Sequence, residues 1–215
     1  LDHAVKACVE GRLLNNGQSC ISAKRLIVTK NNIKSFIKKL INELDPKIMG
    51  DPHDDVDYGP LVSLSARAEV HKMVESSMKM GAKLCLGGKI PTFEGAYYPI
   101  TVLSKVQPGM PAFEEEIFGP VFSIIEANDN DHAIDLANNS KFGLGAAVFT
   151  SDISKGKKIA EEKIQAGICF VNDYVKSDPR LPFGGVKMSG YGRELSGYGL
   201  MEFVNIKTIV VENNK

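Results

Sequence analysis

The sequence has no excess of charge of either sign, because 26 Lys and Arg residues balance 26 Asp and Glu residues. This balance gives no support for a nucleic-acid or anionic-membrane partner. No apolar run approaches the ~18 residues of a membrane-spanning helix, and no secretory signal is recognisable. CxxC pairs are also missing, and the His residues are not spaced near cysteines as metal ligands would be, so we expect no metal site.

Four cysteines are present, Cys8, Cys20, Cys85 and Cys169, in no pattern typical of disulfides. Free thiols are typical of a reducing compartment, so we expect a cytoplasmic protein. Cys8 falls on the apolar face of a predicted helix, and Cys85 and Cys169 fall in apolar strand runs. In such places a free cysteine acts as a small buried hydrophobe.

Hydrophobic residues make up 43% of the chain and charged residues 24%, which is enough to bury a sizeable core. Strands that alternate with helices of about ten to fifteen residues predict an α/β fold, with a mostly parallel sheet flanked by helices. The predicted helices span residues 3–14, 31–44, 65–80, 129–139 and 153–165, and the predicted strands span 25–29, 84–86, 97–106, 120–127, 146–150 and 168–171.

The alternation stops after residue 171. Residues 172–199 are rich in Gly, Pro, Ser and Asp, and a long irregular stretch inside a compact domain is usually functional. Residues 205–212 alternate weakly between apolar and polar side chains, which predicts a final strand.

Cys20 follows the polar bend Asn15-Asn16-Gly17-Gln18-Ser19 and precedes the predicted strand at 25–29. A thiolate at such a bend can attack a carbonyl carbon, and the Cys20 N–H can donate to the resulting oxyanion. No His is nearby in sequence to act as its base, so a carboxylate or an activated water from elsewhere is required. The alternative reading is a small buried hydrophobe, as for the other three cysteines.

Three acidic residues, Glu114, Glu115 and Glu116, lead directly into the segment Ile117-Phe118-Gly119-Pro120. Glu114 and Glu115 fit a solvated loop. Glu116 adjoins the start of a predicted strand, and a carboxylate held at a strand end can bind the paired hydroxyls of a ribose.

A third unusual segment runs from Leu181 to Glu194. It is not a Walker loop, because the GxxxxGK spacing fails. It is not a dinucleotide fingerprint either, because no strand precedes Gly190 and a third glycine is missing.

Together the three segments resemble the aldehyde dehydrogenase superfamily. The matching motifs are Asn-x-Gly-Gln-x-Cys, then Glu-Glu-Ile-Phe-Gly-Pro-Val, then Pro-Phe-Gly-Gly-x-Lys-x-Ser-Gly-x-Gly-Arg-Glu. Their order and spacing fit the second half of the family's usual chain, from just before the nucleophile to the C-terminal strand.

The resemblance implies that Cys20 attacks a small-molecule aldehyde, that hydride passes to NAD or NADP, and that water then releases the acid. It implies that Glu116 holds the nicotinamide ribose and that Phe118 packs against the nicotinamide. Phe183 would lie in the wall of the substrate tunnel, and Glu194 would belong to a proton relay.

The resemblance also divides the chain. Residues 1–188 would form the catalytic domain, and residues 189–204 would return toward a cofactor domain, with Lys187 and Arg193 as structural links. Residues 205–215 would form an oligomerisation strand and tail, and we expect the full-length form to be a homodimer or homotetramer.

Several features of the family would precede Leu1: the general-base Glu, the oxyanion Asn, the Gly-rich cofactor turn and the Lys that meets the ribose or 2′-phosphate. We therefore expect the 215-residue chain to be a fragment that by itself neither binds NAD(P) properly nor turns over.

The runs Lys24-Arg25 and Ser177-Asp-Pro-Arg180 look most like bacterial succinate-semialdehyde dehydrogenases. An aldehyde that ends in a carboxylate needs a cation and hydroxyl donors at the outer end of the tunnel, and Ser177 and Arg180 are the candidates. A solvated loop charge is the alternative reading of Arg180. Leu14 stands where well-studied members of that branch carry an Arg.

Two other functions stay open. One is an acylating aldehyde dehydrogenase or a phosphate-ester reductase of the same fold, although the pair Gly-Gln-Ser-Cys and Glu-Ile-Phe-Gly-Pro argues against it. The other is a truncated, inactive chain that serves in subunit assembly.

Overall fold

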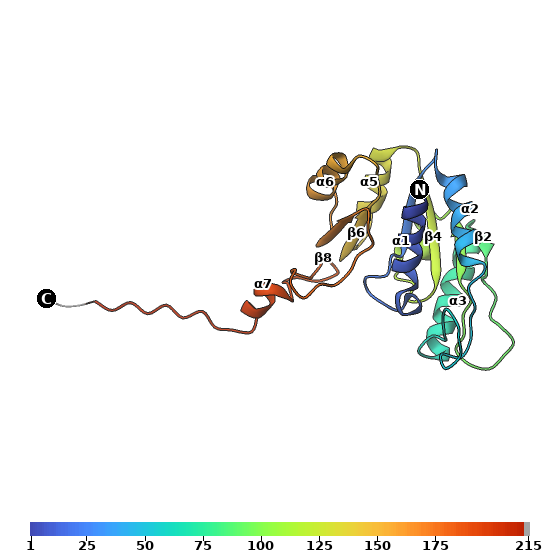
Figure 1. Ribbon diagram of the computed structural model, residues 1–215, viewed down its shortest axis with the longest axis horizontal. Helices are drawn as coiled ribbons and strands as arrows, with labels where there is room; N and C mark the ends of the chain where they lie inside the picture. Colours follow the sequence, from blue (N-terminus) through green and yellow to red (C-terminus); the bar gives the residue numbers. More distant parts are fainter. Residues whose placement is uncertain (213–215) are drawn as a thin grey trace.

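The computed structural model describes residues 1–212 of the 215-residue chain. The largest sheet among these residues has four strands in the order β1-β4-β3-β2. Figure 1 labels two of them, β4 and β2. Strands β1 (Arg25–Thr29), β4 (Val121–Ala127) and β3 (Thr101–Ser104) are parallel, and β2 (Lys83–Leu86) pairs with β3 in the antiparallel direction. The predicted α/β class and mostly parallel sheet are confirmed.

Helices cover both faces of this sheet. The helices are α1 (Asp2–Leu13), α2 (Ile33–Leu44), α3 (Leu64–Lys79), α4 (Pro111–Glu114) and α5 (Asn130–Asn138). Side chains of α1 and α2 pack with Phe122 and Ile124 on one face, whereas side chains of α3, α4 and α5 pack with Val121 and Ile125 on the other. Because both faces are buried, β4 is a nearly continuous apolar run rather than an alternating one.

Local sequence determines where several helices begin. Ser63 accepts a hydrogen bond from the Ala66 N–H (3.1 Å) at the start of α3, and Asp129 accepts one from the His132 N–H (2.9 Å) at the start of α5. Asp152 does the same for the Lys155 N–H (2.9 Å) at the start of α6 (Ile153–Glu162). Each cap satisfies one of the N–H groups that a first helical turn leaves unpaired.

Two smaller sheets follow in the second part of the chain. Strands β6 (Gly145–Val148) and β7 (Ile168–Val171) pair in parallel, and β5 (Phe142–Gly143) pairs with β8 (Val186–Lys187) in the antiparallel direction. The segment after β7 returns to the main body: Asn172 O contacts His3 Nε2 at 2.6 Å, and Tyr174 packs on Gly11, where a Cβ would lie 2.7 Å from it.

The structure differs from the sequence-based expectation at the C-terminus. A short helix, α7 (Ser196–Met201), lies in the stretch that we expected to be irregular. Residues 205–212 form no strand, and their side chains are exposed on a segment that extends away from the body (Figure 1). The remainder of the expected tail, 213–215, lies outside the described residues. None of the described helices is both long enough and apolar enough to cross a membrane.

Candidate active site

The bend before Cys20 follows α1 directly. Asn15 and Asn16 both have positive φ values (49° and 56°) within the short 3₁₀ turn η1 (Leu14–Gly17), a conformation that asparagine tolerates better than most residues. Gly17 continues in the left-handed region (φ 76°) and lies against a distant backbone, because a Cβ there would be 2.2 Å from Gly119 O. Only glycine allows this approach.

Side-chain amides hold the bend in place. Asn15 Nδ2 donates to Gln18 O (3.1 Å), and Gln18 Nε2 donates back to Asn15 O (3.3 Å). Gln18 Oε1 also accepts from the Val62 N–H (2.8 Å), and Asn16 Nδ2 donates to Pro60 O (3.2 Å). The polar residues of the motif are therefore structural parts of the loop that presents Cys20.

Cys20 lies in a tight turn closed by the hydrogen bond from the Ser22 N–H to Ser19 O (3.1 Å), and it is exposed. The Cys20 N–H donates no hydrogen bond to any group within residues 1–212. The turn thus offers a thiol and a free backbone donor at one position, which is the combination that attack on a carbonyl requires. The buried-hydrophobe reading does not fit this exposed cysteine.

The parallel pairing of β1 with β4 brings a second segment to the same place. Arg25 lies opposite Ser123 in the register, so the residues that lead into the two strands meet where both strands begin, at one edge of the sheet. One of these segments ends at Lys24 and the other runs from Glu116 to Pro120. Within the second segment, Glu116 and Phe118 are exposed and Ile117 and Gly119 are buried, which places the carboxylate and the ring on the open side.

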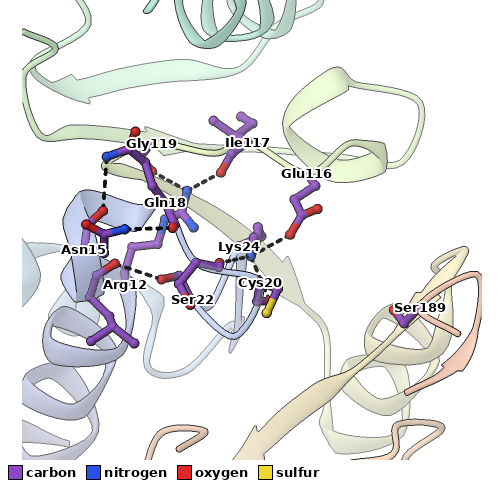
Figure 2. A network of polar contacts seen from close by, with 12 residues as sticks. Arg12, Asn15, Gln18, Cys20, Ser22, Lys24, Glu116, Ile117, Gly119 and Ser189 are labelled. Carbon is purple, nitrogen blue, oxygen red and sulfur yellow. Dashed lines mark hydrogen bonds and ion pairs between the residues drawn. The ribbon is translucent and has the colours of Figure 1, made fainter. Parts of the chain in front are cut away.

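Arg12 fixes this second segment from beneath (Figure 2). It lies in the last turn of α1 and is fully buried (0% exposed). Its Nε donates to Val121 O (2.7 Å), and its Nη2 donates to Ile117 O (2.6 Å) and to Gly119 O. Burial lowers the pKa of Arg12 to about 9, against the attraction of Glu116, so the guanidinium remains charged at neutral pH.

Lys24 connects Cys20 with Glu116. Its ammonium lies 2.8 Å from Glu116 Oε1 and donates to Ser19 O (2.6 Å) and Cys20 O (3.0 Å). The same Nζ lies 5.3 Å from the centre of the Phe118 ring. Figure 2 shows Cys20, Lys24 and Glu116 gathered at this edge. Cys20, Glu116 and Phe118, which we singled out from the sequence, therefore lie together.

The other candidate residues lie in a separate segment. Phe183 and Glu194 pair with each other through their backbones, with N–H to O distances of 2.8 and 2.7 Å. Ser177 is exposed, and Arg180 makes a forked pair with Asp178, Nε to Oδ1 at 2.9 Å and Nη2 to Oδ2 at 2.6 Å. Within residues 1–212, no hydrogen bond or ion pair joins these four residues to Cys20, Lys24 or Glu116.

Arg180 also lines an open cavity of about 340 Å³, together with Pro182, Ser196, Tyr198 and Met201. The cavity is at the junction between the irregular stretch and α7, not at Cys20.

A solvent-facing thiol whose N–H is free within residues 1–212, beside a carboxylate and an exposed aromatic ring, is an arrangement that can form a covalent bond with a carbonyl carbon. The sequence model of the aldehyde dehydrogenase family matches residues 1–209. The chain belongs to the aldehyde dehydrogenase family.

Relatives with assigned names agree with this class. The chain is 46% identical over 210 residues to the succinate semialdehyde dehydrogenase [NAD(P)+] Sad of Escherichia coli strain K12. The aligned residues make up 97% of this chain and 45% of that protein. It is 45% identical to succinate-semialdehyde dehydrogenase [NADP(+)] 1 of Mycobacterium tuberculosis, with 97% and 46% coverage. The chain spans about half the length of the curated relatives it matches.

Solved structures show the same fold. The succinic semialdehyde dehydrogenase of Streptococcus pyogenes, solved in complex with NADP+, matches with a TM-score of 0.94 and 37% identity, over 99% of this chain and 47% of that one. An aldehyde dehydrogenase of M. tuberculosis complexed with NAD+ matches with a TM-score of 0.90 and 34% identity, over 94% and 42% of the two chains.

Sequence reasoning missed Arg12 and Lys24 as parts of the site. Arg12 had a visible signal, because it follows Val5, Cys8 and Val9 at three- and four-residue steps and so places an arginine on the buried face of α1. Lys24 stood in the Lys24-Arg25 run of the family resemblance, but nothing there gave it a role at the site, since a lysine before a strand usually stays in solvent. Its ion pair with Glu116 becomes apparent only when β1 and β4 are paired.

Replacing Arg12 by Met tests the support beneath the site. We expect the free energy of unfolding to fall by about 3–5 kcal/mol, because the buried Ile117, Gly119 and Val121 carbonyls lose their charged donor. Urea unfolding of the purified chain measures this. Arg180→Met is the matched control, because that side chain is 85% exposed and its loss should cost less than about 0.5 kcal/mol. Equal losses would contradict the buried role of Arg12.

The cysteines should differ in reactivity. Burial raises the pKa of Cys8 to about 12 and that of Cys169 to about 11, from an ordinary value of 9.0, so at pH 8 their thiolate fractions fall by about 100-fold or more. We expect iodoacetamide to modify exposed Cys20 well before either. Mass spectrometry of the cysteine-containing peptides after short exposures gives the order, and earlier modification of Cys8 or Cys169 would contradict it.

Proposed function

We propose that this chain carries the catalytic thiol of an NAD(P)-dependent dehydrogenase that oxidises an aldehyde to a carboxylic acid. The supporting observation is the position of Cys20, exposed on a tight turn with its N–H free within residues 1–212. Glu116 and Phe118 lie at the same edge of the sheet, so the thiol and the two groups that we propose to bind the nucleotide are neighbours.

The chemistry follows from these groups. The Cys20 thiolate adds to the aldehyde carbon, the π electrons of the carbonyl move onto oxygen, and the Cys20 N–H donates to that oxygen. Bound NAD(P)+ supplies the acceptor for the hydride that the carbon loses, which leaves a thioester on Cys20. Water then adds to the thioester, the C–S bond breaks, and the acid and the thiolate are released. Glu194 is this chain's candidate for passing on the proton of that water.

Glu116 and Phe118 suit a nicotinamide nucleotide. The Glu116 side chain is 38% exposed, and Lys24 binds its Oε1, which leaves Oε2 for ribose hydroxyls. The Phe118 residue is 40% exposed and presents a flat ring for the nicotinamide. The named relatives include an NAD(P)+ enzyme and an NADP+ enzyme, so NAD or NADP is the proposed cofactor.

We propose succinate semialdehyde as the substrate, because both named relatives act on it and because Arg180 and Ser177 are available to bind its carboxylate. Arg180 is held by Asp178, whose pKa it lowers to about 2, and it faces the cavity described above. A carboxylate ligand would compete with Asp178 for the fork of the guanidinium. Phe183 is the proposed aromatic wall between Arg180 and the thiol.

Assembly is the second candidate role. The segment after α7 exposes a run of apolar side chains: Phe203, Val204, Ile206, Ile209, Val210 and Val211. Apolar surface of this extent is typical of a partner interface. This favours the expected homodimer or homotetramer, in which residues 205–212 would complete a sheet of a second copy.

Removing the thiol tests the proposed activity. In the full-length protein, Cys20→Ala should lower the rate of aldehyde-dependent NAD(P)+ reduction by about 1,000-fold or more, because the covalent step is lost. Cys85→Ala, which removes another partly accessible thiol, should keep the rate within about twofold. Absorbance at 340 nm measures the reaction. Activity that survives Cys20→Ala would overturn the proposal.

Arg180→Ala tests the substrate. The KM for succinate semialdehyde should rise about tenfold, whereas the KM for a neutral aldehyde of the same length should stay nearly constant, because only the first carries a carboxylate. Lys176→Ala removes a neighbouring cation that is paired with Asp173 at 2.9 Å and serves as the control. Equal effects of Arg180→Ala on both aldehydes would exclude this assignment.

A further inference from the structure

Lys24 makes two hydrogen bonds and one ion pair within the candidate site. A lysine ammonium has three N–H donors, and three oxygens lie within 3.0 Å of Lys24 Nζ: Ser19 O, Cys20 O and Glu116 Oε1. Two of the three belong to the turn that carries the nucleophile, and the third belongs to the proposed ribose-binding carboxylate. The Lys24 side chain is only 15% exposed, so water does not easily replace these partners.

The charges around Lys24 make its ammonium dependent on the three oxygens that it contacts. Burial lowers the pKa of Lys24, and Glu116 opposes that shift by hydrogen bonding and charge. Arg12 adds repulsion, whereas a Cys20 thiolate adds attraction. A poorly solvated ammonium next to a guanidinium depends on its anionic and carbonyl partners, so it holds the two segments at one separation.

A second lysine in the chain shows what is particular to Lys24. Lys141 Nζ lies 2.8 Å from Glu115 Oε2 and 5.2 Å from the centre of the Phe142 ring, which nearly reproduces the distances of Lys24 to Glu116 and Phe118. However, the Lys141 and Glu115 side chains are 39% and 51% exposed, and no hydrogen bond from Lys141 reaches the Cys20 turn in the described part of the chain. Lys141 has the same ion pair without the link to the nucleophile.

We propose that Lys24 is a positioning residue that ties the Ser19–Cys20 turn to Glu116 and Phe118, so that the thiol and the nucleotide-binding groups keep one relative geometry. The proposal rests on the function proposed above for Cys20 and Glu116. Lys24 binds one oxygen of Glu116 and leaves the other for the ribose, and its charge lies over Phe118. It would therefore orient the hydride acceptor toward the carbon that is bound to Cys20.

The first test needs no activity. Hydrogen exchange of the purified chain, resolved by peptide, compares Lys24→Met with Lys141→Met. We expect Lys24→Met to speed exchange about tenfold in both residues 15–22 and residues 114–120, because the two segments lose a shared charged donor. Lys24→Arg should restore most of the protection. Lys141→Met should leave residues 15–22 unchanged, and equal effects of the two Met variants would overturn the link.

The second test separates positioning from general stability. In the full-length protein, Lys24→Met should raise the KM for the nicotinamide cofactor about tenfold and lower kcat, with the KM for aldehyde changed less than about twofold. Lys24→Arg should recover both parameters in large part. A purely structural residue would lower the active fraction without changing the cofactor KM, and that outcome would overturn the proposal.

Two further measurements distinguish a failure of the Lys24 proposal from a misfolded variant and from a failure of the proposed function. If Lys24→Met does not fold, Glu116→Gln replaces it in the exchange experiment, where faster exchange at residues 15–22 supports the link and unchanged exchange refutes it. If the full-length protein without substitutions oxidises no aldehyde, the proposed function fails, whereas the exchange result still decides whether Lys24 joins the two segments.

Discussion

A buried guanidinium organises the candidate site. Arg12 reaches from the last turn of α1 to the carbonyls of Ile117 and Val121, and to that of Gly119 between them. Buried carbonyls without a donor are costly, so the segment that leads into β4 has one favourable position against α1. The close approach of Gly17 to Gly119 O adds a steric limit to the same contact. Since the Cys20 turn continues from α1, fixing this segment also fixes Glu116 relative to the thiol.

The pairing of β1 with β4 brings the residues of the candidate site together. β1 and β4 are parallel neighbours, so the segments that enter them lie side by side although they are far apart in sequence. Each segment contributes something different: the first a thiol and a free N–H, the second a carboxylate and a ring. Lys24, at the entrance to β1, is placed where one ammonium can reach both segments.

The second part of the chain is arranged differently. Arg180 and Ser177 are exposed, Phe183 and Glu194 are held mainly by their mutual backbone pairing, and the apolar side chains after α7 face solvent. Burial of apolar surface is the main driving force for association, and these exposed apolar side chains are the basis of the assembly role proposed above.

Much of the architecture could be read from the sequence, because it is determined by local patterns. The strands at 25–29 and 168–171 were placed at their observed bounds, since apolar runs of that length are recognisable without knowledge of their neighbours. Cys20 and Glu116 became candidates because a cysteine after a polar bend and a carboxylate before a strand differ from their surroundings, and Phe118 became one through the family resemblance. The strand expected at 205–212 is absent from the structure, because a strand needs a partner for its hydrogen bonds and weak alternation does not supply one.

What the sequence alone determined is the α/β class, the family motifs and the choice of Cys20 as the candidate nucleophile. Only the tertiary structure decided how these parts meet. The parallel register of β1 and β4, the hydrogen bonds of buried Arg12 and the ion pair of Lys24 with Glu116 are long-range contacts, and their energies depend on desolvation that no short window of sequence contains. The bend that carries Cys20 was visible as a local pattern, whereas its neighbours became known only once the chain was folded.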